Sequence, residues 1–256
     1  MLPRREPVWQ ETLVGALASL GYSQPAARRA VSRSRTDGWL VAERRGRRAR
    51  MSLSEDTAAL LRTGAARIYT FGERWEWDDR WLVLVLRVPE QRREVRHQLR
   101  AQLAWAGLGS LGGGVWLTPH VEREAELAAA IRAAPAADAT SFVAELGAMG
   151  DPRSVAAAAW ELDDVSQHYQ RFIEDFETVR PTSPEACFRM QTLLVHAWRK
   201  FPFLDPDLPP DFLPRRWPRE RAHALFVNRH NRWEPAAREY FETLEGERPQ
   251  TTARAA

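Results

Sequence analysis

Residues 21–38 read Gly-Tyr-Ser-Gln-Pro-Ala-Ala-Arg-Arg-Ala-Val-Ser-Arg-Ser-Arg-Thr-Asp-Gly. The glycine that opens this stretch ends an apolar helix predicted for Trp9–Leu20. Ser23 suits the N-cap of a second helix, and Pro25 fits its first turn, where a backbone N–H is not needed. At 100° per residue, this second helix, which runs to Asp37, places small apolar side chains on one side and arginines and hydroxyls on the other. It can therefore pack closely on its neighbour while its basic side stays in solvent.

A basic hairpin is predicted directly after this helix. Trp39–Ala42 is a short apolar strand, a second alternating segment begins at Met51, and Gly46 lies at the centre of the arginine-rich tip between them. A helix-turn-helix followed by such a hairpin is typical of a winged helix, whose second helix enters the major groove of DNA and whose wing contacts phosphates or the minor groove. The predicted DNA-binding residues are Ser23, Arg28, Arg29, Ser32, Arg33, Arg35, Arg44, Arg45, Arg47, Arg48 and Arg50. The alternative interpretation is a small helical cap with a basic surface loop.

The net charge is divided unevenly along the chain of 256 residues. Residues 1–50 hold 11 basic and four acidic residues, a net charge of +7, whereas the remaining 206 hold 26 basic and 30 acidic residues, a net charge of −4. Lys200 is the only lysine, so genome composition can account for the preference for arginine. It does not account for the scarcity of acids in the first fifth of the chain. A basic head on an acidic body predicts a polyanion-binding N-terminus.

Membrane and secreted classes are disfavoured by the composition. The apolar run Leu82–Leu86 has the length of a strand rather than of a membrane span, and no apolar signal segment follows the first residues. Cys187 is the only cysteine, so the chain cannot form an intrachain disulfide, and a reducing compartment fits. We therefore expect a cytoplasmic protein without a membrane partner.

No catalytic or metal-binding constellation is predicted. The six histidines lack zinc-ligand spacing, and no Walker or nucleophile-elbow motif occurs. The run Gly107–Gly112 matches G-x-G-x-x-G, but it follows a predicted helix and precedes a predicted strand, whereas a dinucleotide site needs the opposite order. We interpret this run as a turn. Cys187 is interpreted as a buried apolar residue, and no cofactor is expected.

The middle of the chain predicts a small α+β unit, and the remainder is strongly helical. The middle elements are a strand at Arg80–Val88, a helix at Gln91–Trp105, a strand at Val115–Thr118, a helix at Glu122–Ala134 and a strand at Ser141–Leu146. This order is typical of a ferredoxin-like sandwich. The later helices are predicted near Val155–Trp160, Val165–Thr178, Pro184–Phe201 and Arg219–Leu244, with Pro235 as a potential break in the last. Prolines interleaved with apolar residues at 202–218 predict an ordered strap.

Three stretches together resemble the PaaX-type repressors of phenylacetic acid catabolism. They are Gly21–Arg33 with Asp37–Leu40 and Gly46–Arg48, then Trp81–Val88 with Gly114–His120, and finally His196–Phe201 with the strap. The resemblance implies a homodimer that binds an operator in double-stranded DNA and is released by an aryl- or acyl-CoA thioester, such as phenylacetyl-CoA. Cations suit the phosphates of this effector, and aromatic rings suit its acyl end. The predicted effector-binding residues are therefore His196, Trp198, Arg199, Lys200, Phe201, Arg215, Arg216 and Trp217.

The chain departs from this family in two places. Members have another helix before the segment that corresponds to Leu2–Arg4, so either the start codon is assigned downstream of the true one or a helix of the winged-helix core is lost. The family's central domain is similar to a CRISPR-associated small nuclease, which needs an aspartate at the end of its first strand. This chain has Arg87-Val88-Pro89-Glu90 there. We therefore expect no nuclease activity and a role in dimerisation or ligand binding.

The sequence thus predicts an α+β protein of three domains. These are a winged helix-turn-helix at residues 1–63, with its first helix missing, a ferredoxin-like central domain with its connector at 64–150, and a helical effector domain at 151–256. The expected function is that of a repressor, and the protein is not expected to be an enzyme. Two alternatives remain: a ligand-sensing interaction protein that no longer binds DNA, and a metal-dependent nuclease acting through the central domain.

Overall fold

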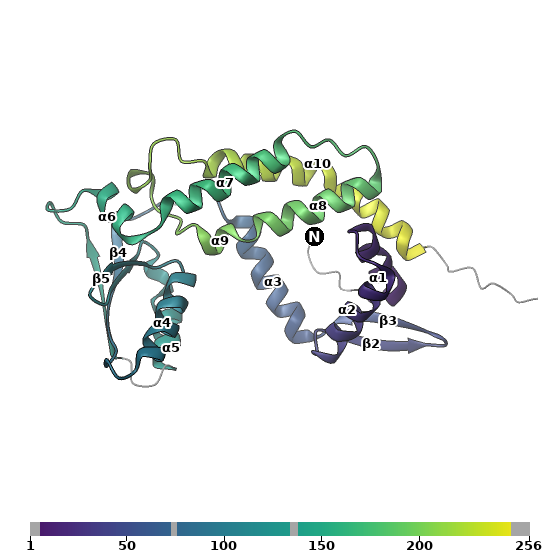
Figure 1. Ribbon diagram of the computed structural model, residues 1–256, viewed down its shortest axis with the longest axis horizontal. Coiled ribbons are helices and arrows are strands. Elements are labelled where there is room, and N and C mark those ends of the chain that lie inside the picture. The colour runs from purple at the N-terminus through teal and green to yellow at the C-terminus, as the bar shows by residue number, and fades with distance from the viewer. Residues whose placement is uncertain (1–5, 73–75, 134–137, 247–256) are drawn as a thin grey trace, which may run out of the picture. The chain divides into compact units, whose positions relative to one another are not determined.

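The computed structural model of the protein describes residues 6–72, 76–133 and 138–246 (Figure 1). Within these residues the fold is α+β and contains two antiparallel sheets. The chain divides into two compact units, each assembled from separate segments. The first unit comprises residues 1–70, 175–198 and 224–256, and the second comprises residues 71–174 and 199–223. No helix within the described ranges is long and apolar enough to cross a membrane.

The first unit begins with a small module of helices and strands. Its elements are β1 (Val8–Trp9), α1 (Gln10–Ser19), α2 (Gln24–Thr36), β2 (Leu40–Arg45) and β3 (Arg48–Leu53), and α3 (Glu55–Thr70) follows it. We call residues 6–53 the N-terminal module. Its strands lie in the order β1-β3-β2, and its buried core consists of Val14, Ala27, Val31 and Met51. Because the most buried residue of α2 is an alanine, α2 packs closely on α1.

Two further helices complete the first unit: α8 (Pro184–Trp198) and the part of α10 (Arg219–Gly246) that follows residue 223. Trp198 stacks on Phe226 with ring centroids 4.7 Å apart, and its indole N–H donates to the carbonyl of Ile68 at 3.1 Å. The break that was considered at Pro235 is absent, because α10 continues through this proline. Pro235 and Asn231 are both exposed, so water can bond the carbonyl that the proline leaves without a donor.

The second unit contains a four-stranded sheet. Its elements are β4 (Arg80–Arg87), α4 (Arg93–Trp105), β5 (Gly109–Gly112), β6 (Val115–Thr118), α5 (Glu124–Arg132) and β7 (Asp138–Glu145). The strand order is β5-β6-β4-β7, and every neighbouring pair is antiparallel. Alternate leucines of β4 pack with α4 and α5, whereas Trp81 packs on the opposite side with α6 (Pro152–Ala159) and the strap. Because both faces of β4 are covered, its sequence is apolar almost throughout.

The glycine-rich run that was interpreted as a turn is in part a strand. β5 lies at an edge of the sheet and pairs with β6, with a register irregularity between Ser110 and Gly112. A Cβ atom at Gly109 would lie 2.5 Å from the ring of Trp160, so glycine is needed for this indole to pack there. The indole N–H of Trp160 donates to the carbonyl of Gly107 at 3.1 Å. These glycines therefore allow close packing, which explains a motif that otherwise suggests a nucleotide site.

Candidate nucleic-acid interface

α2 presents a basic face to solvent. Ser23 caps the helix, because its Oγ accepts a hydrogen bond from the N–H of Ala26 at 3.4 Å. Ala27 and Val31 are buried on the side that faces the module core. The exposed positions include Arg28, Arg29, Ser32, Arg33 and Arg35, all predicted from the sequence. None of these four arginines has an ion-pair partner among the residues that the structure describes.

The tip of the β2–β3 hairpin carries a second group of exposed arginines, and Figure 1 shows this hairpin beside α2. Arg44, Arg45 and Arg47 are exposed. Gly46, the first of the two turn residues, has a φ of 65°, a left-handed value that glycine adopts without strain. Arg45 pairs with Glu43 at 2.6 Å, and Nε of Arg44 donates to the carbonyl of Gly46 at 3.2 Å. Such exposed contacts are weak, so these guanidinium groups can exchange them for phosphates.

Arg48 and Arg50, which were also predicted to contact DNA, make contacts with other residues of the first unit. Trp9, predicted as the first helical residue, instead pairs with Arg50 in the sheet. The guanidinium of Arg48 lies 3.9 Å from the centroid of the Trp9 ring, and that of Arg50 lies 5.1 Å from it. Arg48 also pairs with Glu11 at 3.5 Å, and Arg50 donates to the carbonyl of Pro7 at 2.6 Å. Both side chains are half-buried, so their contacts hold β3 to β1 and the start of α1.

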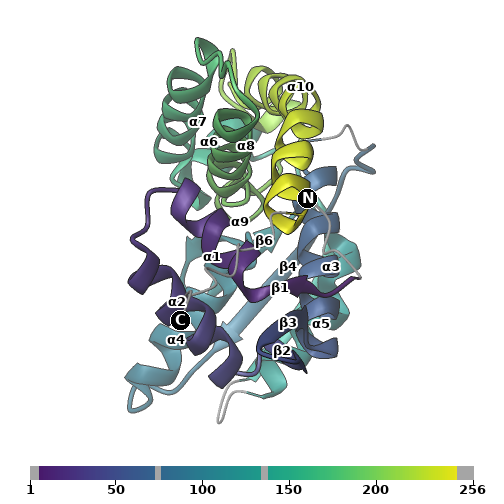
Figure 2. The same cartoon turned by 90° about the vertical axis from the view of Figure 1, so that its right-hand side faces the viewer.

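Glu245, near the end of α10, is a residue of this region that the sequence analysis missed. Its carboxylate accepts hydrogen bonds from the backbone N–H of Trp9 at 3.1 Å, the hydroxyl of Thr12 at 2.7 Å and the guanidinium of Arg50 at 3.2 Å. Both views show the end of α10 beside α1 (Figures 1 and 2). No local signal could have revealed these contacts, because Glu245 is separated from Trp9 by 236 positions in the chain.

The predicted effector-binding residues are divided between the two units. Trp198 belongs to the first unit and is 0% exposed, whereas Phe201, the first residue of α9 (Phe201–Leu204), belongs to the second and is 3% exposed. Phe201 stacks on Tyr169 of α7 (Leu162–Glu177) with centroids 4.1 Å apart. These rings are thus packed in the cores of their units. The exposed members of the predicted set are His196, Arg199, Lys200, Arg215 and Arg216.

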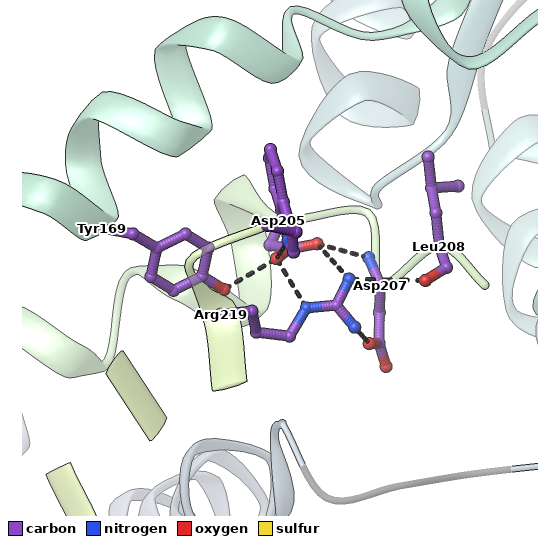
Figure 3. Close-up of polar contacts among 6 residues, drawn as sticks. Tyr169, Asp205, Asp207, Leu208 and Arg219 are labelled. Carbon is purple, nitrogen blue, oxygen red and sulfur yellow. Dashed lines mark hydrogen bonds and ion pairs between the residues drawn. The ribbon is translucent and has the colours of Figure 1, made fainter. Parts of the chain in front are cut away.

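Trp217, the remaining aromatic member, belongs to a buried polar network that holds the strap (Figure 3). The carboxylate of Asp205 accepts hydrogen bonds from the Tyr169 hydroxyl at 2.7 Å and from Nε of Arg219 at 2.9 Å. Asp205 also accepts from the N–H of Asp207 at 2.8 Å, and the Asp207 carboxylate pairs with Arg219. Burial and the neighbouring Asp205 carboxylate hold the pKa of Tyr169 well above its ordinary value, so its hydroxyl stays protonated and donates. The network explains why a proline-rich segment is ordered.

The end of β4 is the place where the sequence analysis found no aspartate of the kind that a metal-dependent nuclease needs. β4 ends at Arg87, and Glu90 lies beyond the strand. Within the described ranges, no group of three or more histidine, cysteine, aspartate or glutamate side chains is arranged to hold a metal ion.

An exposed arginine face beside a basic hairpin is typical of nucleic-acid-binding regulators. Three family models match the chain in order: PaaX-like protein over residues 1–57, PaaX protein central Cas2-like domain over 74–156, and PaaX-like protein C-terminal domain over 160–243. The chain is 30% identical over 263 residues to the transcriptional repressor PaaX of Escherichia coli (strain K12), in an alignment that covers 94% of this chain and 80% of that protein. The chain therefore belongs to the PaaX family, a family of regulators, and is not an enzyme.

A solved structure supports the shared fold. The uncharacterized protein Rv0674 from Mycobacterium tuberculosis is similar to this chain with a TM-score of 0.63. The two sequences are 21% identical, and the superposition covers 90% of each chain.

Proposed function

We propose that the protein is a transcriptional repressor of phenylacetate catabolism that binds an operator in double-stranded DNA. In this proposal the N-terminal module acts as a winged helix, with α2 in the major groove and the β2–β3 hairpin as the wing. The observation that carries the proposal is the exposed arginine face of α2, which has no ion-pair partner within the described part of the chain. Similarity to the E. coli transcriptional repressor PaaX supports it.

The two exposed arginine groups define the proposed contact surface. They comprise Arg28, Arg29, Arg33, Arg35, Arg44, Arg45 and Arg47. If each neutralises one phosphate, the slope of log affinity against log salt concentration is about −6 for one module, at about −0.9 per phosphate. A homodimer would place two modules on the halves of a palindromic or repeated operator, which increases both the affinity and the salt dependence.

An aryl- or acyl-CoA thioester, with phenylacetyl-CoA as the first candidate, is the proposed inducer. Its phosphates need cations, and the exposed Arg199, Lys200, Arg215 and Arg216 are available to provide them. Of the aromatic residues proposed for its acyl end, Trp198 and Phe201 are buried in the cores of their units, and Trp217 is half-buried. Release from DNA requires that the thioester bind the operator-free form more tightly than the bound form.

Fluorescence anisotropy with the DNA upstream of the protein's own gene tests this function. The titration is performed at two salt concentrations, with and without phenylacetyl-CoA. We expect tight binding that weakens steeply with salt and is released by the thioester. Binding without release would retain the repressor but discard this inducer. Absence of binding at low salt would favour a ligand-sensing interaction protein that does not bind DNA.

A further inference from the structure

A groove in the first unit lies between α3 and α10, and none of the residues predicted for the effector lines it. Its volume is about 750 Å³, within the range of small-molecule sites, and its lining comes from these two helices alone. On α3 the lining residues Arg62, Ala65, Ala66 and Tyr69 recur at helical spacing and share one face. The two alanines in the middle leave space that longer side chains would fill.

One end of the groove is aromatic. Tyr69 of α3 and His230 of α10 meet edge to face, with ring centroids 5.2 Å apart. Phe226 lies 6.1 Å from the Tyr69 ring and 5.6 Å from the His230 ring. Nε2 of His230 is buried and has no hydrogen-bond partner among the described residues. The rings of Tyr69 and His230, which both line the groove, give this end an aromatic surface for an aryl or acyl group.

The rest of the groove lining is charged and carries both signs, with Arg62 and Arg238 beside Glu234 and Glu242. Arg62 precedes Tyr69 by seven residues, and Arg238 follows His230 by eight, so at 1.5 Å per residue both arginines lie about 10–12 Å along the helices from the aromatic end. Arg238 pairs with Glu234, its Nε donating at 3.0 Å. Arg62 is exposed and has no ion-pair partner in the part of the chain that the structure describes. The positive charge of Arg62 is therefore available to an anionic ligand group.

We propose that this groove binds an elongated organic anion, with an aryl or acyl end against Tyr69 and His230 and a carboxylate or phosphate at Arg62. Free aryl or acyl acids and acyl thioesters that carry phosphates share this chemistry. The groove is physically connected to the N-terminal module, because α3 begins two residues after β3 and Glu245 of α10 holds Trp9 and Arg50. A ligand that changes the spacing of α3 and α10 therefore shifts the wing. This regulatory step rests on the proposed function, whereas binding in the groove does not.

Titration of the full chain with anilinonaphthalene sulfonate, an aryl anion that fluoresces more strongly in apolar sites, tests the proposal. Ala65→Phe fills the groove, and Arg62→Gln removes the cation that receives the anionic group. Ala59→Phe, at an exposed position of α3 outside the lining, is the matched control. We expect saturable binding to one site in the wild-type chain and the control. Ala65→Phe and Arg62→Gln should each weaken binding about tenfold or more.

The outcomes of this titration test ligand binding in the groove and do not depend on whether the protein binds DNA. Absence of saturable binding to the wild-type chain, or unchanged affinity in both groove variants, would overturn the proposal. Arg62→Gln changes an exposed side chain, so it keeps the test valid if Ala65→Phe does not fold. Displacement of the probe by phenylacetate would identify a free acid as the ligand source, and displacement by phenylacetyl-CoA but not by phenylacetate or CoA would identify a thioester. Failure of all three to displace the probe would also contradict the proposal.

Operator binding without ligand is measured separately by anisotropy. If the wild-type chain binds the operator but not the probe, the groove proposal fails and the repressor stands. If it binds the probe but no operator, and Ala65→Phe abolishes probe binding, the groove stands and the proposed function fails.

Discussion

Arg33 and Arg50 carry the same side chain but lie in different environments. Arg33 is exposed on α2 and has no ion-pair partner among the described residues, whereas Arg50 is half-buried beside Trp9 and bonded to Pro7 and Glu245. The guanidinium of Arg33 is therefore available to bind DNA, whereas that of Arg50 is held by contacts that stabilise the fold. Substitution of Arg33 should therefore change affinity, while substitution of Arg50 should first change stability.

Arg33→Ala is expected to weaken operator binding about tenfold and to reduce the magnitude of the salt slope by about one, because one phosphate contact is lost. Its melting temperature should match that of the wild-type protein. Anisotropy titrations at several salt concentrations measure both quantities. Arg189→Ala, at an exposed position of α8, is the control. Equal effects of the two substitutions would contradict the assigned interface.

The pKa of His230 is expected to be measurably low. Burial disfavours the imidazolium form and lowers this pKa below the ordinary value of 6.5. As the pH falls through 6.5 the unfolded chain takes up the proton first, so His230 lowers the free energy of unfolding in acid. NMR titration of the imidazole measures the pKa, with His230→Gln for assignment.

Denaturation at several pH values tests the linkage of His230 to stability. The His230→Gln variant should lose less stability between neutral and acid pH than the wild-type protein. His97→Gln, at an exposed position of α4, is the matched histidine-to-glutamine control. An imidazole midpoint at or above 6.5 for His230 would contradict the burial that the structure assigns to its ring.

At the scale of elements, the strap and α10 are ordered for reasons that lie outside their own sequences. The strap has few backbone N–H donors because of its prolines. The Asp205 carboxylate accepts hydrogen bonds from residues of α7, the strap and the start of α10. α10 tolerates Pro235 because the proline lies on its exposed side. In both cases the surroundings supply or replace the hydrogen bonds that proline removes.

Asp205→Asn is expected to lower the free energy of unfolding by about 3 kcal/mol, because the largely buried Arg219 loses its main counter-charge. Urea denaturation measures the change. Asp211→Asn, at an exposed position of the same strap, is the control and should change stability little. If the two variants were equally stable, the ion pair would not be what holds the strap.

At the scale of the whole molecule, the first unit is built from both ends of the described chain. The core of the N-terminal module is extended by α10: Leu244 packs against Gly15, and the Ser19 and Tyr240 hydroxyls are hydrogen-bonded at 2.7 Å. The N-terminal module is therefore packed against α10 and is not a structurally independent domain. Any change that moves the end of α10 acts on β1, α1 and β3 together.

Glu245→Ala is expected to lower the free energy of unfolding by about 1–3 kcal/mol, because three donors lose their acceptor. The substitution should also weaken operator binding, because Arg50 and Trp9 of β1 lose their hydrogen bonds to Glu245. Thermal melting and anisotropy measure the two effects. Glu239→Ala, exposed on the same helix, should leave both unchanged. Wild-type affinity in Glu245→Ala would show that α10 does not position the wing.

The parts of the fold that could be predicted are those with local signals. α2 was located from Ser23 and the glycine at each end, and β4 from its apolar run, because caps and periodicity act within a few residues. β5 was missed, since Gly109–Gly112 has no hydrophobic alternation and is defined by Trp160 packing against it. The burial of Trp198 and Phe201 could not be predicted either, because aromatic spacing does not distinguish a core from a pocket wall.

The sequence by itself determined the family resemblance, the basic N-terminal segment and most helices and strands, because each is encoded by neighbouring residues. Tertiary structure alone decided which arginines are free, where Trp198 and Phe201 are buried, and that α3 and α10 enclose a groove. These outcomes depend on contacts such as that between Arg50 and Glu245, which lie 195 positions apart. A periodic pattern predicts which face of a helix is apolar or charged, but only the tertiary structure shows which residues cover that face.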